Sequence, residues 1–112
     1  MSNYRVVDLV YQGIVKEETV TINMYGTVVD KKKPNIEHSI YVIVDDPVKE
    51  VEYYVEVRID EFGVIRVAFI KDLTHDIYLN SDDPVFLDLV KFIDSISDRL
   101  LIYTVLTSRD TD

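Results

Sequence analysis

The chain contains no cysteine, and it has only three glycines and three prolines among 112 residues. The absence of cysteine excludes disulfide bonds, thiol nucleophiles and cysteine-ligated zinc or iron–sulfur sites. Few glycines and prolines leave few positions for turns, so we expect long elements joined by short loops. The sequence also lacks an N-terminal apolar signal core and an apolar run of about 18 residues. It therefore predicts an intracellular, cytoplasmic protein that does not enter a membrane.

Positive charge is scarce: 12 Lys and Arg face 21 Asp and Glu, a formal net charge of −9. A surface of this sign repels phosphate backbones, so direct binding of nucleic acid is not expected. The charge either keeps the protein in solution or attracts a basic partner. Abundant Ile, Val, Tyr and Lys together with few Gly are typical of a thermophilic source.

The residues that are present favour β-structure in one domain that covers residues 1–112. Hydrophobic residues make up 47% of the chain, with eight Tyr, and β-branched and aromatic side chains prefer strands. Alternation of apolar and polar residues predicts strands at 4–11, 19–28 and 39–44, and a short strand near 76–79. Gln12-Gly13 is expected to form a turn after the first strand, and the loop after the second carries the basic run Lys31-Lys32-Lys33.

A β-hairpin between residues 50 and 71 is the clearest local prediction. Its turn residues Asp60-Glu61-Phe62-Gly63 suit a type I turn followed by a left-handed glycine. This turn predicts a register that places Ile59 opposite Ile65, Val57 opposite Val67 and Val55 opposite Phe69, all on the core face. The other face of the first strand is expected to be acidic and exposed.

A C-terminal helix is predicted to begin at Asp83, as the N-cap, and Pro84, in its first turn. Apolar residues then repeat at helical spacing from Phe86 to Tyr103. We expect one long helix over residues 84–107, with a final strand at 100–106 as the alternative. The fold class is thus α+β, an antiparallel, meander-like sheet of four to six strands packed with one long C-terminal helix.

The predicted helix is apolar over a wider arc than one face of a small sheet can cover. Two-fold pairing is the commonest way for identical chains to bury such a surplus. The sequence therefore predicts a homodimer whose interface includes Leu101 and Val105.

No arrangement of residues in the sequence carries a catalytic signature. His38 and His75 are the only imidazoles, and the pairs Asp45-Asp46 and Asp82-Asp83 each precede a proline, where a cap or turn explains them. No phosphate-binding loop, nucleophile elbow or HExxH spacing occurs. We therefore assign no catalytic residue, metal ligand or cofactor.

These observations favour a small, acidic, non-enzymatic protein-interaction module. A basic protein is the expected partner, bound through Glu50, Glu52 and Glu56 on one strand face. A special case is an acidic inhibitor or decoy that acts on a nucleic-acid-handling protein, as small viral proteins do. The alternative is a small metal-dependent hydrolase or nuclease that uses Asp and Glu at the sheet edge, with a histidine.

Overall fold

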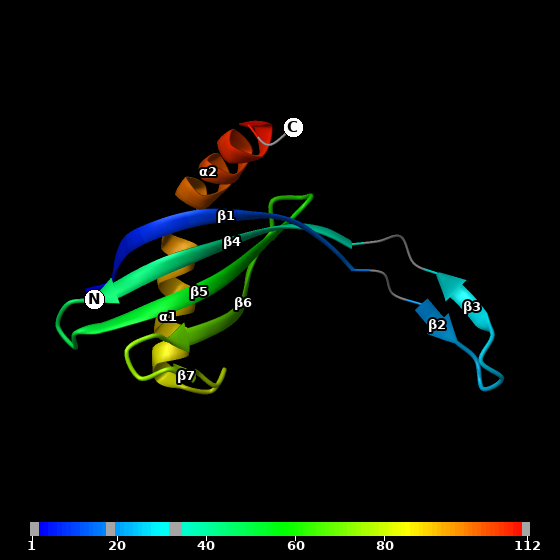
Figure 1. Cartoon of the computed structure of the whole chain (residues 1–112), viewed down its shortest axis with the longest axis horizontal. Helices are drawn as coiled ribbons and strands as arrows, with labels where there is room; N and C mark the ends of the chain where they lie inside the picture. The colour runs from blue at the N-terminus through cyan, green and yellow to red at the C-terminus, as the bar shows by residue number, and fades with distance from the viewer. Residues whose placement is uncertain (1–2, 18–19, 32–34, 111–112) are drawn as a thin grey trace.

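A computed structural model describes residues 3–17, 20–31 and 35–110 of the chain. Its main sheet has five antiparallel strands in the order β1-β4-β5-β6-β7, and two helices follow (Figure 1). The strands of this sheet are β1 (Arg5–Glu17), β4 (Asn35–Asp46), β5 (Val51–Asp60), β6 (Ile65–Asp72) and β7 (Ile77–Tyr78). The predicted α+β class and meander sheet are confirmed, including the short strand near residues 76–79.

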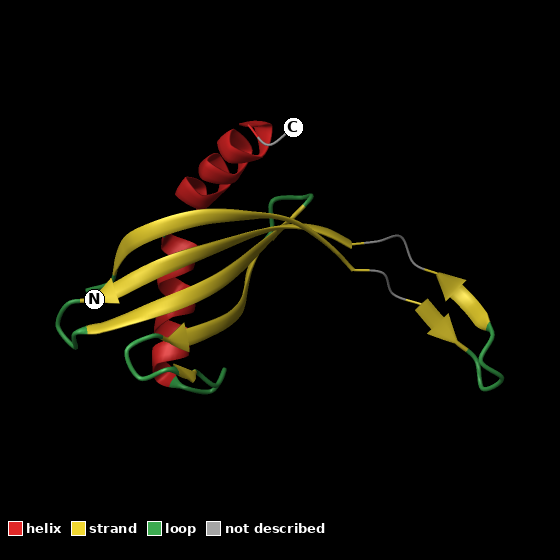
Figure 2. Ribbon diagram, viewed as in Figure 1, coloured by secondary structure: helices red, strands yellow, loops and turns green. Residues whose placement is uncertain are grey.

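The helices α1 (Pro84–Ser95) and α2 (Ser97–Asp110) lie on one side of the sheet (Figure 2). Alternate residues of the central strands point toward them, because successive side chains of a strand face opposite ways. This face forms the hydrophobic core with Leu89 and Ile93 of α1 and Leu100 of α2. The sheet residues of the core are Ile40, Val42, Val44, Val51, Tyr53, Val55, Val57, Ile59 and Ile70. The opposite face of the sheet, called the open face below, is not covered by either helix.

The first strand is longer than the sequence predicted. The turn expected at Gln12-Gly13 is wrong, because β1 continues to Glu17 in register with β4. Register shifts between Val6 and Asp8 and between Tyr11 and Gly13 mark irregularities in the strand. Gly13 has a φ of 112°, a conformation that suits glycine at a bulge and does not end the strand.

The single strand predicted over residues 19–28 is also wrong, because the segment forms a hairpin. Strand β2 (Val20–Ile22) pairs with β3 (Val28–Lys31) in a separate sheet that projects from the body as an arm (Figure 1). Asn23 makes the turn: its Oδ1 accepts hydrogen bonds from the Tyr25 and Thr27 amides, over 2.9 and 3.0 Å. Gly26 supplies the left-handed position with a φ of 79°. Of the basic run, Lys32 and Lys33 lie outside the described residues.

The predicted β5–β6 hairpin forms, but half of its register differs. Ile59 pairs with Ile65 and Val57 with Val67, as expected. A bulge then makes Ala68 the extra residue, so Phe69 pairs with Glu56 and turns to the open face. Ile70 takes the core position opposite Val55 that the sequence had assigned to Phe69, which is therefore a correction to the predicted core.

The C-terminal region is two helices, so the predicted single long helix over 84–107 is wrong, and so is the alternative strand at 100–106. Asp83 caps α1 as predicted, accepting a hydrogen bond from the Val85 amide over 2.9 Å. The break falls at Ile96, whose φ of −108° and ψ of 18° leave the helical region. The Ser95 hydroxyl donates to the Phe92 carbonyl at this point, and such bonds to the backbone compete with helical ones.

The break redirects α2 toward and past the edge strand β1 (Figure 1). The Tyr103 hydroxyl accepts a hydrogen bond from the Tyr11 amide over 3.1 Å and donates to the Leu9 carbonyl over 3.0 Å. Neither α1 nor α2 is long and apolar enough to span a membrane, and no other helix occurs in the described part of the chain.

Candidate interaction surfaces

The three glutamates assigned to partner binding do not share one environment. Glu50 lies in the β4–β5 turn and Glu52 at the start of β5, and both are exposed. Glu56 is only 5% exposed, so the expectation that it is solvated is wrong. Only Glu50 and Glu52 therefore remain available to a partner.

Glu56 is the centre of a buried polar cluster on the open face. Its Oε1 accepts a hydrogen bond from the Ser39 hydroxyl and its Oε2 one from the Tyr54 hydroxyl, each over 2.6 Å. With its amide nitrogen turned inward, Gln12 donates to Oε1 over 2.9 Å. Burial and the bond to Glu56 raise the pKa of Tyr54 to about 12, so this hydroxyl stays protonated at neutral pH. The Glu56 carboxylate is thus used in hydrogen bonds within the protein.

Two arginines lie beside this cluster. The Arg66 guanidinium donates two hydrogen bonds to the Glu37 carboxylate, over 2.8 and 2.9 Å. This bidentate pair lowers the pKa of Glu37 even though burial acts to raise it. Nε of Arg58 is 3.6 Å from Oε1 of Glu56, which is an ion pair but is too long for a hydrogen bond.

A row of four aromatic side chains crosses the open face from β4 to β7, and we call it the aromatic stripe. Tyr41 and Tyr54 stack with ring centroids 5.0 Å apart, and Tyr54 and Phe69 stack at 5.6 Å. Tyr78 meets Phe69 edge-on at 5.6 Å. Tyr54 thus has a ring against each of its faces, whereas Tyr41 and Phe69 each have one face against Tyr54. Phe69 is 37% exposed and Tyr78 64%.

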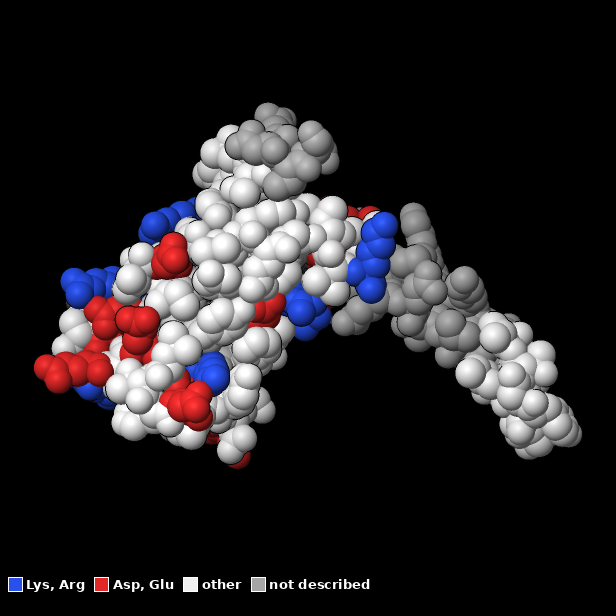
Figure 3. All heavy atoms as spheres, viewed as in Figure 1, with Lys and Arg blue, Asp and Glu red and all other residues white. Residues whose placement is uncertain are grey.

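Charge is distributed unevenly around the stripe. Figure 3 shows the open face with a largely uncharged middle and with acidic side chains gathered toward the end near the β4–β5 turn, where basic side chains lie among them. At that end Asp8 and Glu52 are exposed, and Asp45 forms an ion pair with Arg5 over 2.9 Å. We refer to Asp8, Glu50 and Glu52 as the acidic rim. The open face thus combines an aromatic centre with one negative border.

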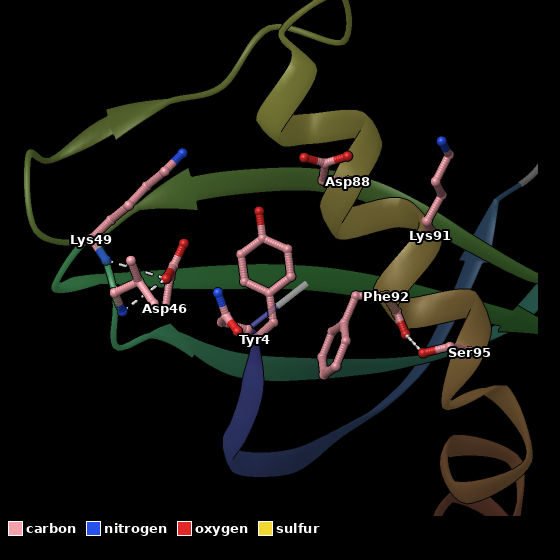
Figure 4. Close-up of a pocket in the computed structure, with 9 residues that line it drawn as sticks. Tyr4, Asp46, Lys49, Asp88, Lys91, Phe92 and Ser95 are labelled. Carbon is pink, nitrogen blue, oxygen red and sulfur yellow. Dashed lines mark hydrogen bonds between the residues drawn. The ribbon is translucent and has the colours of Figure 1, made fainter. Parts of the chain in front are cut away.

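A pocket of about 460 Å³ lies on the other side of the molecule, between the start of β1, the β4–β5 turn and α1 (Figure 4). The Tyr4 hydroxyl points into it, with Lys49 on one side and Asp88 on the other. Burial and the nearby Asp88 raise the pKa of Tyr4, so this hydroxyl is neither an effective base nor an anionic nucleophile at neutral pH. Asp46 is committed to the turn, where it accepts from the Val48 and Lys49 amides. The pocket can hold a small charged molecule, but its residues do not form an acid–base pair suited to catalysis.

The histidines and acidic pairs are held in separate local interactions. Nδ1 of His38 is 2.9 Å from the Tyr11 hydroxyl, whereas Nδ1 of His75 is 2.8 Å from Oδ2 of Asp72. Burial acts to raise the pKa of Asp72, but the hydrogen bonds from His75 outweigh it and lower that pKa. Within residues 3–17, 20–31 and 35–110, no three His, Asp or Glu side chains come together as metal ligands.

The residues predicted for a dimer interface differ in exposure. Leu101 is half-buried and packs against the core, next to Gly63 of the hairpin turn. Val105 is 52% exposed and lies on α2 with Ile102 and Leu106, which are 61% and 58% exposed. The arm is a further apolar surface, since Met24 and Tyr25 at its tip are 88% and 84% exposed. The interface assignment stays a prediction.

Sequence reasoning did not find the aromatic stripe, because its members come from four strands and the bulge at Ala68 decides the face of Phe69. Two features of the sequence could have indicated the stripe: the eight tyrosines of the chain, and the presence of Tyr41 and Tyr54 in neighbouring predicted strands. Comparison of the chain with protein-family models, curated proteins and solved structures gave no match.

Proposed function

We propose that this protein is a non-enzymatic interaction module that binds a basic protein on the open face of its sheet. The observation that carries the proposal is the aromatic stripe of Tyr41, Tyr54, Phe69 and Tyr78 beside an acidic rim, with Phe69 and Tyr78 exposed and the two other rings half-buried. Tyrosine and phenylalanine are enriched in the energetically dominant centres of protein interfaces. A face that presents them without a covering layer is suited to the same use.

The arrangement of the rings favours a protein over a nucleic acid or a sugar. Bases and sugars bind aromatic side chains by stacking on their flat faces. In the stripe both faces of Tyr54 are occupied, because it stacks with Tyr41 and Phe69 at interplanar angles of 27° and 15°, and one face each of Tyr41 and Phe69 is occupied by Tyr54. Ring edges and the hydroxyl groups of Tyr41 and Tyr78 remain for apolar side chains and backbone carbonyls of a partner.

The acidic rim and the net charge of −9 favour a partner that is basic. Complementary charge at the border of an interface accelerates association and orients the two molecules. A nucleic-acid-handling protein is one class that carries such basic surfaces, so the acidic inhibitor or decoy is a narrower form of the same proposal.

The open face is large enough for a protein interface. Strands lie about 4.8 Å apart and rise about 3.4 Å per residue, so four strands of about nine residues cover roughly 590 Å² in plan. The accessible surface of the side chains is larger than the plan area, and a typical interface needs about 800 Å² per partner.

The test compares proteins from source cells retained on the immobilised chain with those retained on two variants. Tyr78→Ala removes an exposed member of the stripe, and Leu87→Ala removes a side chain of similar exposure on α1, away from the open face. We expect a basic protein to be retained by the unmodified chain and by Leu87→Ala, to be lost with Tyr78→Ala, and to elute as salt is raised. Equal retention on both variants, or no salt-dependent binder, would contradict the proposal.

The alternative, a metal-dependent hydrolase or nuclease, has no comparable support. The residues it would use, Asp45, Asp46 and the histidines, are engaged in separate turns and ion pairs, and the described part of the chain contains no ligand cluster.

A further inference from the structure

The outer edge of β6 carries backbone groups that point away from the sheet. The Asp60 amide bonds to the Val64 carbonyl over 3.1 Å at the hairpin end. Because bonding alternates along an antiparallel pair, Ile65 and Val67 direct their N–H and C=O groups outward, away from β5. Further along, the outward carbonyl of Ile70 accepts from the Leu79 amide over 2.9 Å, and β7 pairs with Lys71 and Asp72. Strand β7 thus covers only the last part of this edge.

An apolar groove lies beside the same stretch of β6. It has a volume of about 230 Å³ and runs between the strand and α1. Ile65 and Val67 form its strand side, and Val90 and Ile93 form its helix side. Lys91 and Asp94 lie at its border and offer one charge of each sign. A strand added along β6 would place every second side chain in this groove.

The opposite edge of the sheet is formed by β1, and two of its outward backbone groups are bonded to a side chain, unlike those of β6 at Ile65 and Val67. On β1, the Tyr103 hydroxyl satisfies both the Tyr11 amide and the Leu9 carbonyl at the middle of the strand. Capped and bulged edges resist the addition of another strand. For the described residues, no corresponding side-chain bond reaches the backbone of Ile65 or Val67.

We propose that the outer edge of β6 binds a short extended segment of another protein, which adds to the sheet as a strand and places an apolar side chain against Val90. Backbone groups supply the affinity in this mode of recognition and the adjoining groove supplies the selectivity. The free stretch, from Ile65 to Ala68, spans about 14 Å at 3.4 Å per residue. That length suits a short segment and is small for a stable pairing of two copies of this chain. This site is separate from the aromatic stripe and does not depend on the function proposed above.

The test uses a phage-displayed library of random 12-residue peptides selected against the full 112-residue protein. Enriched peptides are synthesised and titrated while backbone amide exchange of the protein is followed. We expect them to alternate apolar and polar residues, and to slow exchange at Ile65 and Val67. Methylation of alternate peptide nitrogens should weaken binding by about tenfold or more, because it removes the donors of the added strand.

Two substitutions test the backbone edge of β6 and the apolar groove independently. Val67→Pro removes an outward N–H that β5 does not use, and Val90→Glu puts a charge in the groove; each should weaken binding by about tenfold or more. Leu87→Glu is the matched control on the exposed side of α1 and should bind as the unmodified protein does. Retained exchange protection of Val55 and Val57 verifies that a variant is folded.

The proposal is overturned if no peptide is enriched, if protection appears on β1 or on the open face, or if both Val67→Pro and Val90→Glu bind normally. Protection of Ile65 and Val67 that depends on protein concentration without peptide would make a second copy the occupant, which also overturns it. Equal retention on Tyr78→Ala and Leu87→Ala in the capture experiment would contradict the proposed function and leave this site unaffected, so the two proposals fail separately.

Discussion

At the scale of single residues, the buried carboxylate of Glu56 explains how a polar group can lie on a sheet face without serving as a contact. Transfer of a charge out of water is costly unless hydrogen bonds replace its hydration. Ser39 and Tyr54 provide such bonds over 2.6 Å, and Arg58 provides an opposite charge at 3.6 Å. The hydrogen bond from Tyr54 to Glu56 holds the Tyr54 ring at the centre of the aromatic stripe.

Replacement of Glu56 by alanine should destabilise the protein by about 3 kcal/mol, because the hydroxyl donors and Arg58 lose their partner. Glu52→Ala is the matched control, since Glu52 lies on the same strand and is exposed; it should change stability by less than about 0.5 kcal/mol. Urea unfolding measures both. Similar effects for the two variants would mean that the buried cluster does not contribute to stability.

The ion pair between Glu37 and Arg66 predicts a dependence of stability on pH. Hydrogen bonding to Arg66 lowers the pKa of Glu37 in the folded state, so the unfolded chain binds a proton more readily. Its contribution is therefore present at neutral pH and is lost as the pH falls below the ordinary carboxyl pKa toward the lowered value.

In Glu37→Gln and in Arg66→Gln this contribution should be absent. Each variant should be less stable than the unmodified protein at neutral pH, and the difference should shrink on acidification. Urea midpoints measured between about pH 3 and pH 7 provide the comparison. A difference that stays constant over this range would show that Glu37 does not titrate through this ion pair.

At the scale of elements, local turn and cap chemistry was predictable and the irregularities were not. Asp60 to Gly63 and Asp83-Pro84 fix a turn and a helix start through their own backbone preferences, so the sequence located both. The bulge at Ala68 and the break at Ile96 interrupt the two repeating patterns, and the period of a pattern does not show where it will be interrupted. The stripe depends on the bulge and was missed for that reason.

The revised register makes a prediction for two neighbouring residues of β6. Ile70 is fully buried, so Ile70→Ala should destabilise the protein by about 2–5 kcal/mol. Phe69 is 37% exposed and contributes mainly its ring contacts, so Phe69→Ala should cost about 1 kcal/mol. Thermal or urea unfolding measures the order. A larger loss for Phe69→Ala would restore the register without the bulge.

At the scale of the whole molecule, the helices cover only one face of the sheet and leave apolar surface elsewhere. The break at Ile96 lets α1 bury Leu89 and Ile93 and lets α2 bury Leu100, which uses more of the apolar arc than one straight helix could. Ile102, Val105 and Leu106 remain more than half exposed. These three side chains form the apolar surface that the predicted homodimer would bury.

We expect the 13.0 kDa chain to sediment as a dimer at micromolar concentration. Val105→Asp should give a monomer of unchanged stability, because Val105 is 52% exposed within one chain. Leu101→Asp should also disrupt the dimer, but it will destabilise each chain because Leu101 packs against the core. A monomer that persists in the unmodified protein would rule out this interface.

The central claim, that the open face binds a basic protein, is tested most directly by photo-crosslinking in source cells. A photoreactive amino acid is placed at Phe69 on the open face or, as the control, at Leu87 on α1; these side chains are 37% and 52% exposed. We expect a discrete adduct with a basic protein from position 69 and none from position 87. Adducts from position 87 alone, or none from either position, would contradict the proposed binding. An adduct with a second copy of the chain would show that the open face binds the protein itself and not a basic partner.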